Sequence, residues 1–429
     1  MKKIALVSLG CAKNQVDSEA ILALFKKPYF EITLDLNEAD VIIVNTCGFI
    51  LSAKEENINT ILDVIRYKKK TVVIGCLVER YYEELKKEIP EVDLWIKFSD
   101  EYRYLPERIS KLFDDEVSLP EFNITNRIND DKAITYLKIA EGCDKFCAYC
   151  AIPYIRGRFK SYSIETLTNY VKEISKKGIK EIVLIAQDPT SYGKDFKEKK
   201  LRLVDLLREI AAIDGIEFIK TLYLYPEGID DELINFIKNE KKCSHYFDIP
   251  LQHINNTILK NMNRKNDKKS IIDLIEKIKK VIPDVILRTT LIVGFPGETK
   301  KQFEELKEFV KKTKFNHLGV FTYSREEGTR AYSLPKQVRE STKIKRKEEI
   351  MALQAKISYK LNKEMIGRIF KGLIISENNN EYLLSCDFNA PDDVDGKVIL
   401  INNKEHKIGD IVEVRVTNSF VYDLLVEEI

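Results

Sequence analysis

Short apolar runs alternate with amphipathic stretches over the first ninety or so residues of the chain. The apolar runs, which are rich in β-branched residues, are Lys3–Leu9, Asp40–Thr46 and Thr71–Cys76. Stretches with helical periodicity follow them, at about Val16–Lys27, Leu51–Arg66 and Glu79–Glu88. Buried strands that alternate with helices indicate a parallel sheet covered on both faces. The pattern therefore predicts an N-terminal doubly wound parallel α/β domain, which we place at residues 1–127.

The same alternation resumes after a polar stretch at 99–131, which contains "DDEVSLPEFN" and is typical of a linker. The strand-like runs are Ile134–Ala140, Glu181–Gln187, Ile219–Tyr225, Tyr246–Gln252, Val285–Val293 and His317–Ser324. Helical stretches between them include Ser163–Lys177, Leu201–Ile213, Ser270–Ile282 and Lys300–Lys312. Six such units are fewer than the eight of a closed barrel, so we predict an open (β/α)₆ partial barrel over residues 128–360.

The pattern changes once more beyond a charged helix that is predicted from Glu340 to Met365. Short runs of alternating apolar and polar residues, separated by turn residues, fill the rest of the chain. Such a pattern is typical of a small all-β barrel or sandwich. We place this third domain at residues 361–429.

Composition and charge exclude some classes of protein, although they do not identify a single class. The chain has 429 residues with 32% charged and 44% hydrophobic residues, which is an ordinary balance for a globular protein. Its N-terminus lacks the features of a signal peptide, and no apolar run approaches the roughly 18 residues of a membrane helix. We therefore expect a cytoplasmic protein whose eight cysteines stay reduced. Clustered cysteines in that compartment indicate metal binding or redox chemistry.

Three cysteines are crowded into "EGCDKFCAYC" (Glu141–Cys150), with the spacing C-x₃-C-x₂-C. A zinc site needs a fourth ligand, and the nearest histidine along the chain is His245. A disulfide framework is disfavoured in a reducing compartment, and a thioredoxin-like C-x₂-C pair would leave Cys143 unexplained. Three thiolates on a four-iron cluster would leave one iron open. An open iron can bind S-adenosylmethionine, whose radical chemistry proteins delegate to such cofactors.

This segment resembles the radical S-adenosylmethionine enzymes, because an aromatic residue precedes its last cysteine and the first barrel strand precedes the motif. The resemblance implies that the three thiols of Cys143, Cys147 and Cys150 hold a 4Fe-4S cluster and that Tyr149 lies against the adenine of the cofactor. "IVGFPGET" (Ile292–Thr299), which contains Gly294, resembles the family's cofactor-contact segment. Polar residues expected at other strand ends are candidates for methionine and ribose contacts: Gln187, Gln252 and Arg288. The Gly-Gly-Glu that usually follows the second strand of the family is replaced in this chain by "AQD" (Ala186–Asp188).

Three further cysteines, Cys11, Cys47 and Cys76, each stand at or just after the end of a predicted N-terminal strand. Because the carboxyl ends of parallel strands share one sheet edge, we expect the three thiols to converge there. The alternative is that they are three separate buried cysteines at strand ends. Cys243 and Cys386 belong to no cluster, and we expect both to be small core or near-surface residues.

The surroundings of these cysteines resemble the N-terminal domain of the methylthiotransferases, at "SLGCAKNQVDSE" (8–19), "NTCGFI" (45–50) and "GC" (75–76). That family joins this domain to a radical S-adenosylmethionine barrel and a C-terminal TRAM barrel, in the same order as in this chain. The resemblance implies that Cys11, Cys47 and Cys76 hold a second 4Fe-4S cluster, which would carry a sulfur methylated by a second S-adenosylmethionine. Since a carbon radical attacks that sulfur, we expect no protein side chain to act as a catalytic acid or base.

Charge in the C-terminal domain bears on the substrate. Methylthiotransferases divide into tRNA enzymes and a ribosomal-protein branch, RimO. The segment Leu361–Ile429 carries seven lysines and arginines against thirteen aspartates and glutamates, whereas a module that binds RNA should be basic. An acidic module suits a basic ribosomal protein, and "APDDVDGKV" (Ala390–Val398) resembles a turn of RimO TRAM domains. The basic stretch at 336–361 points the other way, and we interpret it as a solvated helix face.

These observations favour a RimO-type enzyme that methylthiolates the β-carbon of an aspartate in small-subunit ribosomal protein S-twelve. Such an enzyme would need an external electron donor and no membrane, and it would act on no nucleic acid directly. One alternative is a tRNA methylthiotransferase acting on the adenosine beside the anticodon. A second alternative is a non-catalytic iron–sulfur redox sensor.

Overall fold

The computed structural model describes residues 1–97, 100–113, 124–128, 133–197, 200–378, 381–391, 395–401 and 404–429. It divides the chain into two compact units, the first made of Met1–Asp130, Glu141–Asp144 and Cys150–Lys160 and the second of the remainder. The predicted barrel and the C-terminal domain thus share one unit, and the three predicted domain ranges stay a prediction. The predicted linker "DDEVSLPEFN" and residues 392–394 of the turn "APDDVDGKV" lie outside the described residues.

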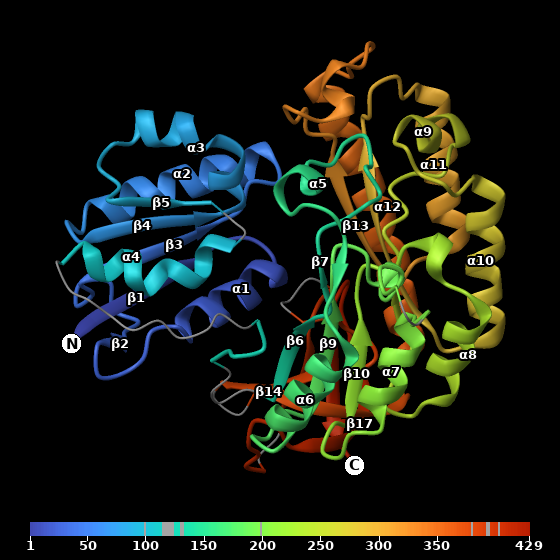
Figure 1. Cartoon of the computed structure of the whole chain (residues 1–429). Coiled ribbons are helices and arrows are strands. Elements are labelled where there is room, and N and C mark those ends of the chain that lie inside the picture. The colour runs from blue at the N-terminus through green and yellow to red at the C-terminus, as the bar shows by residue number, and fades with distance from the viewer. Residues whose placement is uncertain are drawn as a thin grey trace. The chain divides into compact units, whose positions relative to one another are not determined.

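A parallel sheet forms the core of the first unit (Figure 1). Its strands are β1 (Lys2–Ser8), β2 (Phe30–Ile32), β3 (Val41–Thr46), β4 (Lys70–Gly75) and β5 (Leu94–Ile96). They are arranged in the order β2-β1-β3-β4-β5, which is the doubly wound order with its switch point between β1 and β3. The doubly wound parallel fold is therefore confirmed. The apolar pattern did not predict the short strands β2 and β5, which have three residues each.

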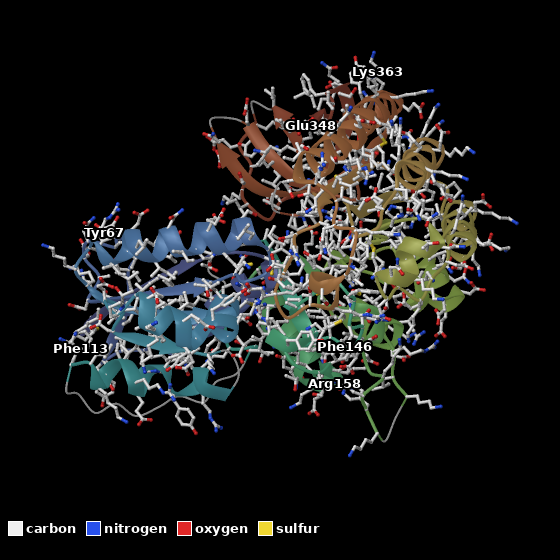
Figure 2. The ribbon with its side chains drawn as sticks, turned by 90° about the horizontal axis from the view of Figure 1, so that it is seen from above. Tyr67, Phe113, Phe146, Arg158, Glu348 and Lys363 are labelled. Carbon is white, nitrogen blue, oxygen red and sulfur yellow. The ribbon has the colours of Figure 1, made fainter. Side chains whose placement is uncertain are left out.

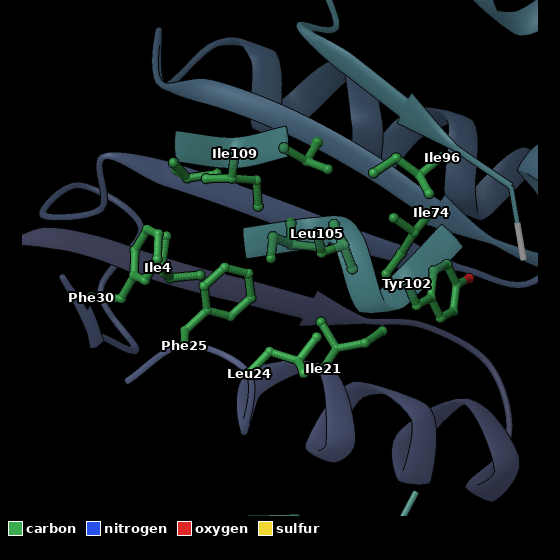
Figure 3. Close-up of a cluster of buried hydrophobic side chains, with 13 residues drawn as sticks. Ile4, Ile21, Leu24, Phe25, Phe30, Ile74, Ile96, Tyr102, Leu105 and Ile109 are labelled. Carbon is green, nitrogen blue, oxygen red and sulfur yellow. The ribbon is translucent and has the colours of Figure 1, made fainter. Parts of the chain in front are cut away.

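Helices cover both faces of this sheet, and alternate strand residues point to opposite faces. One face packs against α1 (Ala12–Leu22) and α4 (Leu105–Lys111), where Ile74 meets Ile21 and Leu105 in a buried cluster (Figure 3). The other face packs against α2 (Leu51–Ile65) and α3 (Cys76–Glu88). Burial on both faces explains why the strands are apolar at nearly every position. The remaining element of this part is the short helix η1 (Asp100–Tyr104).

Helices α1 and α3 each begin several residues before the apolar periodicity predicts. The reason is that their first turns carry the polar residues or cysteines of the sheet edge, which are buried for reasons other than hydrophobicity. In α1 the missed first turn contains Asn14, which is buried. The hydrophobic pattern therefore misses the part of each helix that lies nearest the sheet edge.

Parallel strands form the centre of the second unit. They are β6 (Ile134–Lys138), β9 (Glu181–Ile185), β10 (Phe218–Thr221), β11 (Tyr246–Asp248), β12 (Ile286–Val293) and β13 (His317–Thr322). They make two three-stranded sheets, β10-β9-β6 and β11-β12-β13, which are joined by a parallel bridge between Ile219 and Cys243. Within the described ranges no pairing closes β13 onto β6. The predicted open (β/α)₆ barrel is therefore confirmed.

Helices lie along the outer side of these strands (Figure 1). The larger ones are α6 (Ile164–Ser175), α7 (Leu203–Ala211), α8 (Asp231–Asn239), α9 (Asn256–Asn261), α10 (Lys268–Val281) and α11 (Lys300–Thr313). Polar N-cap side chains accept hydrogen bonds from backbone N–H groups of the first turns, as Asp267 does from Ser270 and Thr299 from Gln302. Short elements between them are β7 (Ala140–Glu141), α5 (Ile152–Ile155), β8 (Lys160–Ser161), η2 (Pro189–Ser191), η3 (Pro226–Gly228) and η4 (Arg330–Ser333).

The end of the chain forms a long helix and a small barrel. Helix α12 covers Glu340–Met365, as predicted. The strands that follow are β14 (Ile369–Asn378), β15 (Glu381–Ser385), β16 (Val398–Ile401), β17 (Ile411–Ser419) and β18 (Leu424–Glu428). They close into a barrel in the order β14-β15-β16-β18-β17. The predicted small all-β barrel is confirmed.

A fully buried ion pair between two strands of the partial barrel is also hydrogen-bonded to the C-terminal barrel. Lys220 Nζ lies 2.8 Å from Glu181 Oε1 and donates to Ser385 Oγ at 2.7 Å. Both charged side chains are completely buried. None of the helices in the described part of the chain is both long enough and apolar enough to cross a membrane.

Candidate functional site

The carboxyl edge of the first unit's sheet carries three cysteines. Cys11 lies between β1 and α1, Cys47 directly follows β3, and Cys76 begins α3 after β4. The pKa of Cys47 is raised to about 12, mainly by burial and to a smaller extent by the neighbouring Cys76 and Cys11. Thiols affect one another's ionisation in this way only when they are close. The loops that carry the thiols also approach one another closely, since a Cβ at Gly10 would lie 2.8 Å from Cys47 Cβ and one at Gly48 would lie 2.8 Å from Cys76 O. The convergence expected at this sheet edge is therefore confirmed, and Cys11 and Cys47 flank the switch point of the sheet.

Two glycines allow the cysteine-bearing loops to approach each other. Gly10 has φ +98°, and a Cβ there would lie 2.8 Å from Cys47 Cβ. Gly75 has φ +103°, and a Cβ there would lie 2.5 Å from Thr46 O. Both a left-handed backbone and the lack of a side chain are needed at these positions. The "GC" pairs of the sequence therefore serve to bring the loops together.

A buried polar network lies beneath the three thiols and fixes their backbone. Asn14 Nδ2 donates to Leu9 O at 2.9 Å and to Thr46 O at 3.0 Å. Asn45 Nδ2 donates to Asn14 O at 3.1 Å and to Ser18 Oγ at 2.9 Å. These bonds explain why polar residues of "SLGCAKNQVDSE" are buried on the inner face of α1. Buried polar groups are tolerated because each finds a partner.

Three thiols without a fourth nearby ligand suit an iron–sulfur cluster better than zinc. In the described part of the chain no three His, Cys, Asp or Glu side chains converge tightly enough to share one metal ion. Structural zinc requires four such ligands. In a four-iron cluster each thiolate binds a different iron, so the sulfurs need not meet at one point. Burial favours the neutral thiols of Cys47 and Cys76, and bound metal would reverse that preference.

The second set of cysteines lies within one short segment, which is held by backbone contacts. Cys143 N donates to Gly157 O at 3.1 Å, and Ala148 N donates to Met262 O at 2.9 Å. Cys147 Sγ lies 3.9 Å from both Tyr225 Oη and Arg264 Nη1. The arginine places a positive charge beside this sulfur.

Lys145, between the first two cysteines of this motif, ties the segment to the barrel. Its Nζ lies 3.2 Å from Asp188 Oδ2 and 2.8 Å from Glu227 Oε1. Burial lowers the pKa of Lys145, but these two carboxylates raise it overall. Asp188 also accepts a hydrogen bond from Thr190 Oγ1 at 2.5 Å. The "AQD" departure from the family pattern thus supplies an anchor for the cysteine segment.

Among the residues predicted to contact S-adenosylmethionine, Gln252 has the clearest sign of a missing ligand. Its backbone is left-handed, with φ +70°, and it lies just beyond β11. Its Oε1 is buried and has no hydrogen-bond partner among the described residues. A buried acceptor without a partner is costly, and a bound ligand would satisfy it. Gln187 also follows a strand end, two positions beyond β9.

Tyr149 and Gly294 lie in the same part of the second unit. Tyr149 is half-buried and packs against an apolar cluster that contains Ala148, Met262 and Phe295. Gly294 follows β12 with φ +75°, and its N–H donates to Glu298 Oε2. The assignments of Tyr149, Gln187, Gln252 and Gly294 to cofactor contacts stay predictions.

The expected strand-end position of Arg288 is wrong. Arg288 is the third residue of β12, close to the amino end of that strand. Its Nη1 lies 2.9 Å from Asp248 Oδ1 and its Nε 2.9 Å from Asp395 Oδ1. The guanidinium therefore links the partial barrel to the C-terminal barrel. Sequence alone conceals this role because Asp395 is distant along the chain.

Arg156 is among the site residues that sequence reasoning missed, together with Lys145, Glu227 and Arg264. It follows α5, and its guanidinium contacts Cys76 Sγ from a position six residues beyond Cys150. A buried arginine close after a cysteine motif was the only available signal, and burial itself is not visible in the sequence. Cys243 and Cys386 are both buried, in agreement with their expected packing roles.

Three family models match the chain in succession. Residues 3–97 match the family described as "Uncharacterized protein family UPF0004", residues 137–310 the radical SAM superfamily and residues 366–429 the TRAM domain. The first match spans the five-stranded α/β sheet and the third spans the closed β-barrel, whereas the radical SAM match ends at residue 310, before the last strand of the partial barrel, β13.

Relatives match the chain over its whole length. The ribosomal protein uS12 methylthiotransferase RimO of Acetivibrio thermocellus is 46% identical over 100% of this chain and 98% of its own. The protein of the same name from Clostridium acetobutylicum is 45% identical over 99% of this chain and 97% of its own.

Solved structures resemble the fold at low sequence identity. The radical S-adenosylmethionine methyltransferase TsrM from Kitasatospora setae, with cobalamin and a [4Fe-4S] cluster bound, superimposes with a TM-score of 0.57 and 11% identity. The match covers 89% of this chain and 80% of TsrM. At that identity the likeness concerns the fold alone.

Proposed function

Because this chain belongs to the RimO family of radical S-adenosylmethionine methylthiotransferases, we propose that it methylthiolates the β-carbon of an aspartate in ribosomal protein uS12 (S-twelve). The observation that carries the proposal is the 46% identity with a uS12 methylthiotransferase over the full length of both chains. The order of the three parts of the chain supports it as well.

The cofactors of this family are S-adenosylmethionine and two 4Fe-4S clusters, and the cysteines divide into two ligand sets for them. We assign Cys143, Cys147 and Cys150 to one cluster, and the convergent Cys11, Cys47 and Cys76 to the other. When bound, the clusters and S-adenosylmethionine supply the radical that removes a hydrogen atom and the methylthio group that replaces it.

The chain's own residues hold these groups in place. Lys145, Asp188 and Glu227 anchor the segment that carries one ligand set, and Arg264 places positive charge beside Cys147. Gln252 Oε1 is a buried acceptor available to S-adenosylmethionine. No protein acid or base is assigned, since hydrogen-atom abstraction and sulfur transfer require none. Reductive cleavage of S-adenosylmethionine consumes an electron, so an external electron donor of low potential is a necessary partner.

Charge supports a protein substrate over tRNA. The C-terminal segment Leu361–Ile429 is acidic, with seven basic against thirteen acidic residues, and would repel phosphate. The basic stretch at 336–361 was expected to form a solvated helix face, but two of its residues are buried and form hydrogen bonds within the protein. Lys343 Nζ donates to Tyr323 O at 2.8 Å, and Arg346 Nη1 donates to Glu298 O at 3.2 Å. Less positive charge therefore remains on that helix for RNA than the sequence suggests.

Mass spectrometry of uS12 and of total tRNA from cells with and without the gene tests this function. We expect the aspartate-containing peptide of uS12 to lose the mass of one methylthio group in the deletion strain, while tRNA nucleosides stay unchanged. Loss of a methylthioadenosine with intact uS12 would establish the tRNA alternative. No change in either molecule would favour the redox sensor.

A further inference from the structure

Arg156 forms a two-pronged contact with a single cysteine sulfur. Its Nε and its Nη2 both donate to Cys76 Sγ, each at 3.3 Å. The same guanidinium donates to Asn14 Oδ1 at 2.6 Å and to Asp17 Oδ2 at 2.6 Å. Its Nη1 also lies 3.3 Å from Glu141 Oε2. The fork geometry of arginine allows one side chain to make all of these bonds.

The surroundings keep this guanidinium in one place. Arg156 and Cys76 are both buried. Ala151 and Ile155, at the two ends of α5, pack against Cys76 in a small apolar cluster. Helix α5 therefore delivers Arg156 to the sulfur, and the carboxylate of Asp17 holds the guanidinium from its other side. A contact of this kind has a fixed geometry and is shielded from water.

We propose that Arg156 is a positioning residue that raises the reduction potential of the cluster held by Cys11, Cys47 and Cys76. Donors directed at a ligand sulfur stabilise the more electron-rich, reduced state of a cluster, and hydrogen bonds to the sulfurs are one of the factors that set its potential. The proposal rests on the assignment of these three cysteines as cluster ligands.

The hydrogen bonds from Arg156, rather than its net charge, account for most of the rise in reduction potential. The positive charge of Arg156 is opposed by the carboxylates of Asp17 and Glu141. The local charge of the three side chains together is not positive, so a purely electrostatic influence on the cluster would be weak. The two N–H donors at 3.3 Å from Cys76 Sγ remain, and in a buried site such bonds are strong.

By contrast, Cys147 of the other ligand set has a longer contact with an arginine. The contact from Arg264 Nη1 to Cys147 Sγ is a single one at 3.9 Å. Two clusters in one chain can therefore differ in potential because their thiolates are hydrogen-bonded to different extents. The ligand sulfur that Arg156 contacts, Cys76 Sγ, belongs to the first set.

The test isolates one cluster and measures its potential. In the full-length chain carrying Cys143→Ala, Cys147→Ala and Cys150→Ala, only the Cys11, Cys47 and Cys76 set can hold iron. After anaerobic reconstitution with iron and sulfide, a redox titration followed by electron paramagnetic resonance gives the midpoint potential. Adding Arg156→Gln should shift it to more negative values. At a fixed applied potential the ratio of reduced to oxidised cluster should fall about tenfold, the effect of one charge-assisted hydrogen bond.

Two further variants distinguish the effect of hydrogen bonding on the midpoint potential from the effects of charge and of misfolding. Arg156→Lys keeps the charge but loses the fork, so its shift should have the same sign as that of Arg156→Gln. Asp17→Asn removes an opposing negative charge and should shift the potential the other way. Both variants keep a polar side chain at the position, so the buried network retains partners.

Arg158 supplies the matched control, because it belongs to the same segment but lies at the surface with a 78% exposed side chain (Figure 2). Arg158→Gln should leave the midpoint potential unchanged. An unchanged potential in both Arg156 variants, with full iron content, overturns the proposal while leaving the proposed function intact. A background protein that binds no iron overturns the ligand assignment and the proposal with it. Neither outcome depends on the mass spectrometry of uS12.

Discussion

Substitution of single cysteines should separate the cleavage of S-adenosylmethionine from the transfer of the methylthio group. Cys143→Ala should abolish the reductive cleavage of S-adenosylmethionine to 5′-deoxyadenosine, because two thiolates cannot replace the three that hold the cluster. Cys47→Ala should retain much of this cleavage but form no methylthiolated uS12 peptide. Chromatographic assay of 5′-deoxyadenosine beside mass spectrometry of the peptide measures both. A Cys47→Ala protein that still methylthiolates uS12 would contradict the assignment of two ligand sets.

The raised pKa of Cys47 predicts a pH effect on the iron-free protein. Burial holds the thiol neutral in the fold, with a pKa of about 12 against a usual 9.0. A group whose folded pKa is raised stabilises the fold below its unfolded pKa and loses that contribution as the pH rises to the folded value. The apoprotein should therefore lose stability between about pH 9 and pH 12, as measured by urea unfolding. Cys47→Ser should make this dependence less steep, while the Cys76 thiol, whose pKa burial also raises, still contributes to it. An equally steep loss in that variant would mean that the Cys47 thiol is not a cause.

At the scale of elements, the turns that begin helices position the site. Gly75, at the junction of β4 and α3, has no room for a side chain because Thr46 O lies in its path. Gly75→Ala should destabilise the first unit by about 1–3 kcal/mol through backbone strain, with a further cost for the displaced Thr46. In the full-length chain in which Cys143, Cys147 and Cys150 are replaced by alanine, Gly75→Ala should also reduce the amount of iron bound.

Gly178 provides the comparison for that substitution. It has a similar φ of +97°, but no atom lies within 4 Å of the position of an added Cβ. Gly178→Ala should cost only the strain of the left-handed backbone, about 1 kcal/mol, and should leave iron binding unchanged. Equal iron loss in both variants would show that general destabilisation, and not loop approach, is responsible.

For the whole molecule, buried charges connect the partial barrel to the C-terminal barrel. Lys220→Met would leave Glu181 buried without its countercharge, and we expect a loss of about 3–5 kcal/mol in the free energy of unfolding. The double variant Lys220→Met with Glu181→Leu should recover much of this loss, because no unpaired charge remains. Chemical denaturation with fluorescence detection measures each value.

A surface ion pair is the control for this prediction. Lys177 and Glu173 form an exposed i,i+4 pair with side chains 59% and 66% exposed. Lys177→Met should change the free energy of unfolding by less than about 1 kcal/mol. A loss as small as this in Lys220→Met would mean that the buried pair contributes no special stability.

Local pattern was sufficient for the elements and for one of the two ligand sets. The near-continuous apolar strands and the helical periodicity predict both α/β parts, because burial on both faces leaves its mark on consecutive residues. The motif of Cys143, Cys147 and Cys150 is visible for the same reason, since its members are neighbours in the chain. Strand ends also place Cys11, Cys47 and Cys76 at one edge, because parallel strands share that edge.

Tertiary packing alone decided the contacts between residues that are distant in sequence. Arg156 meets Cys76 across 80 positions, and Arg288 meets Asp395 across 107. No periodicity marks such pairs, because a buried charge is satisfied by whichever partner the fold brings near and not by a residue at a fixed spacing. The sequence by itself therefore determines the fold class and the cysteines of the site. Only the folded chain selects the partners that hold those cysteines and join the two barrels.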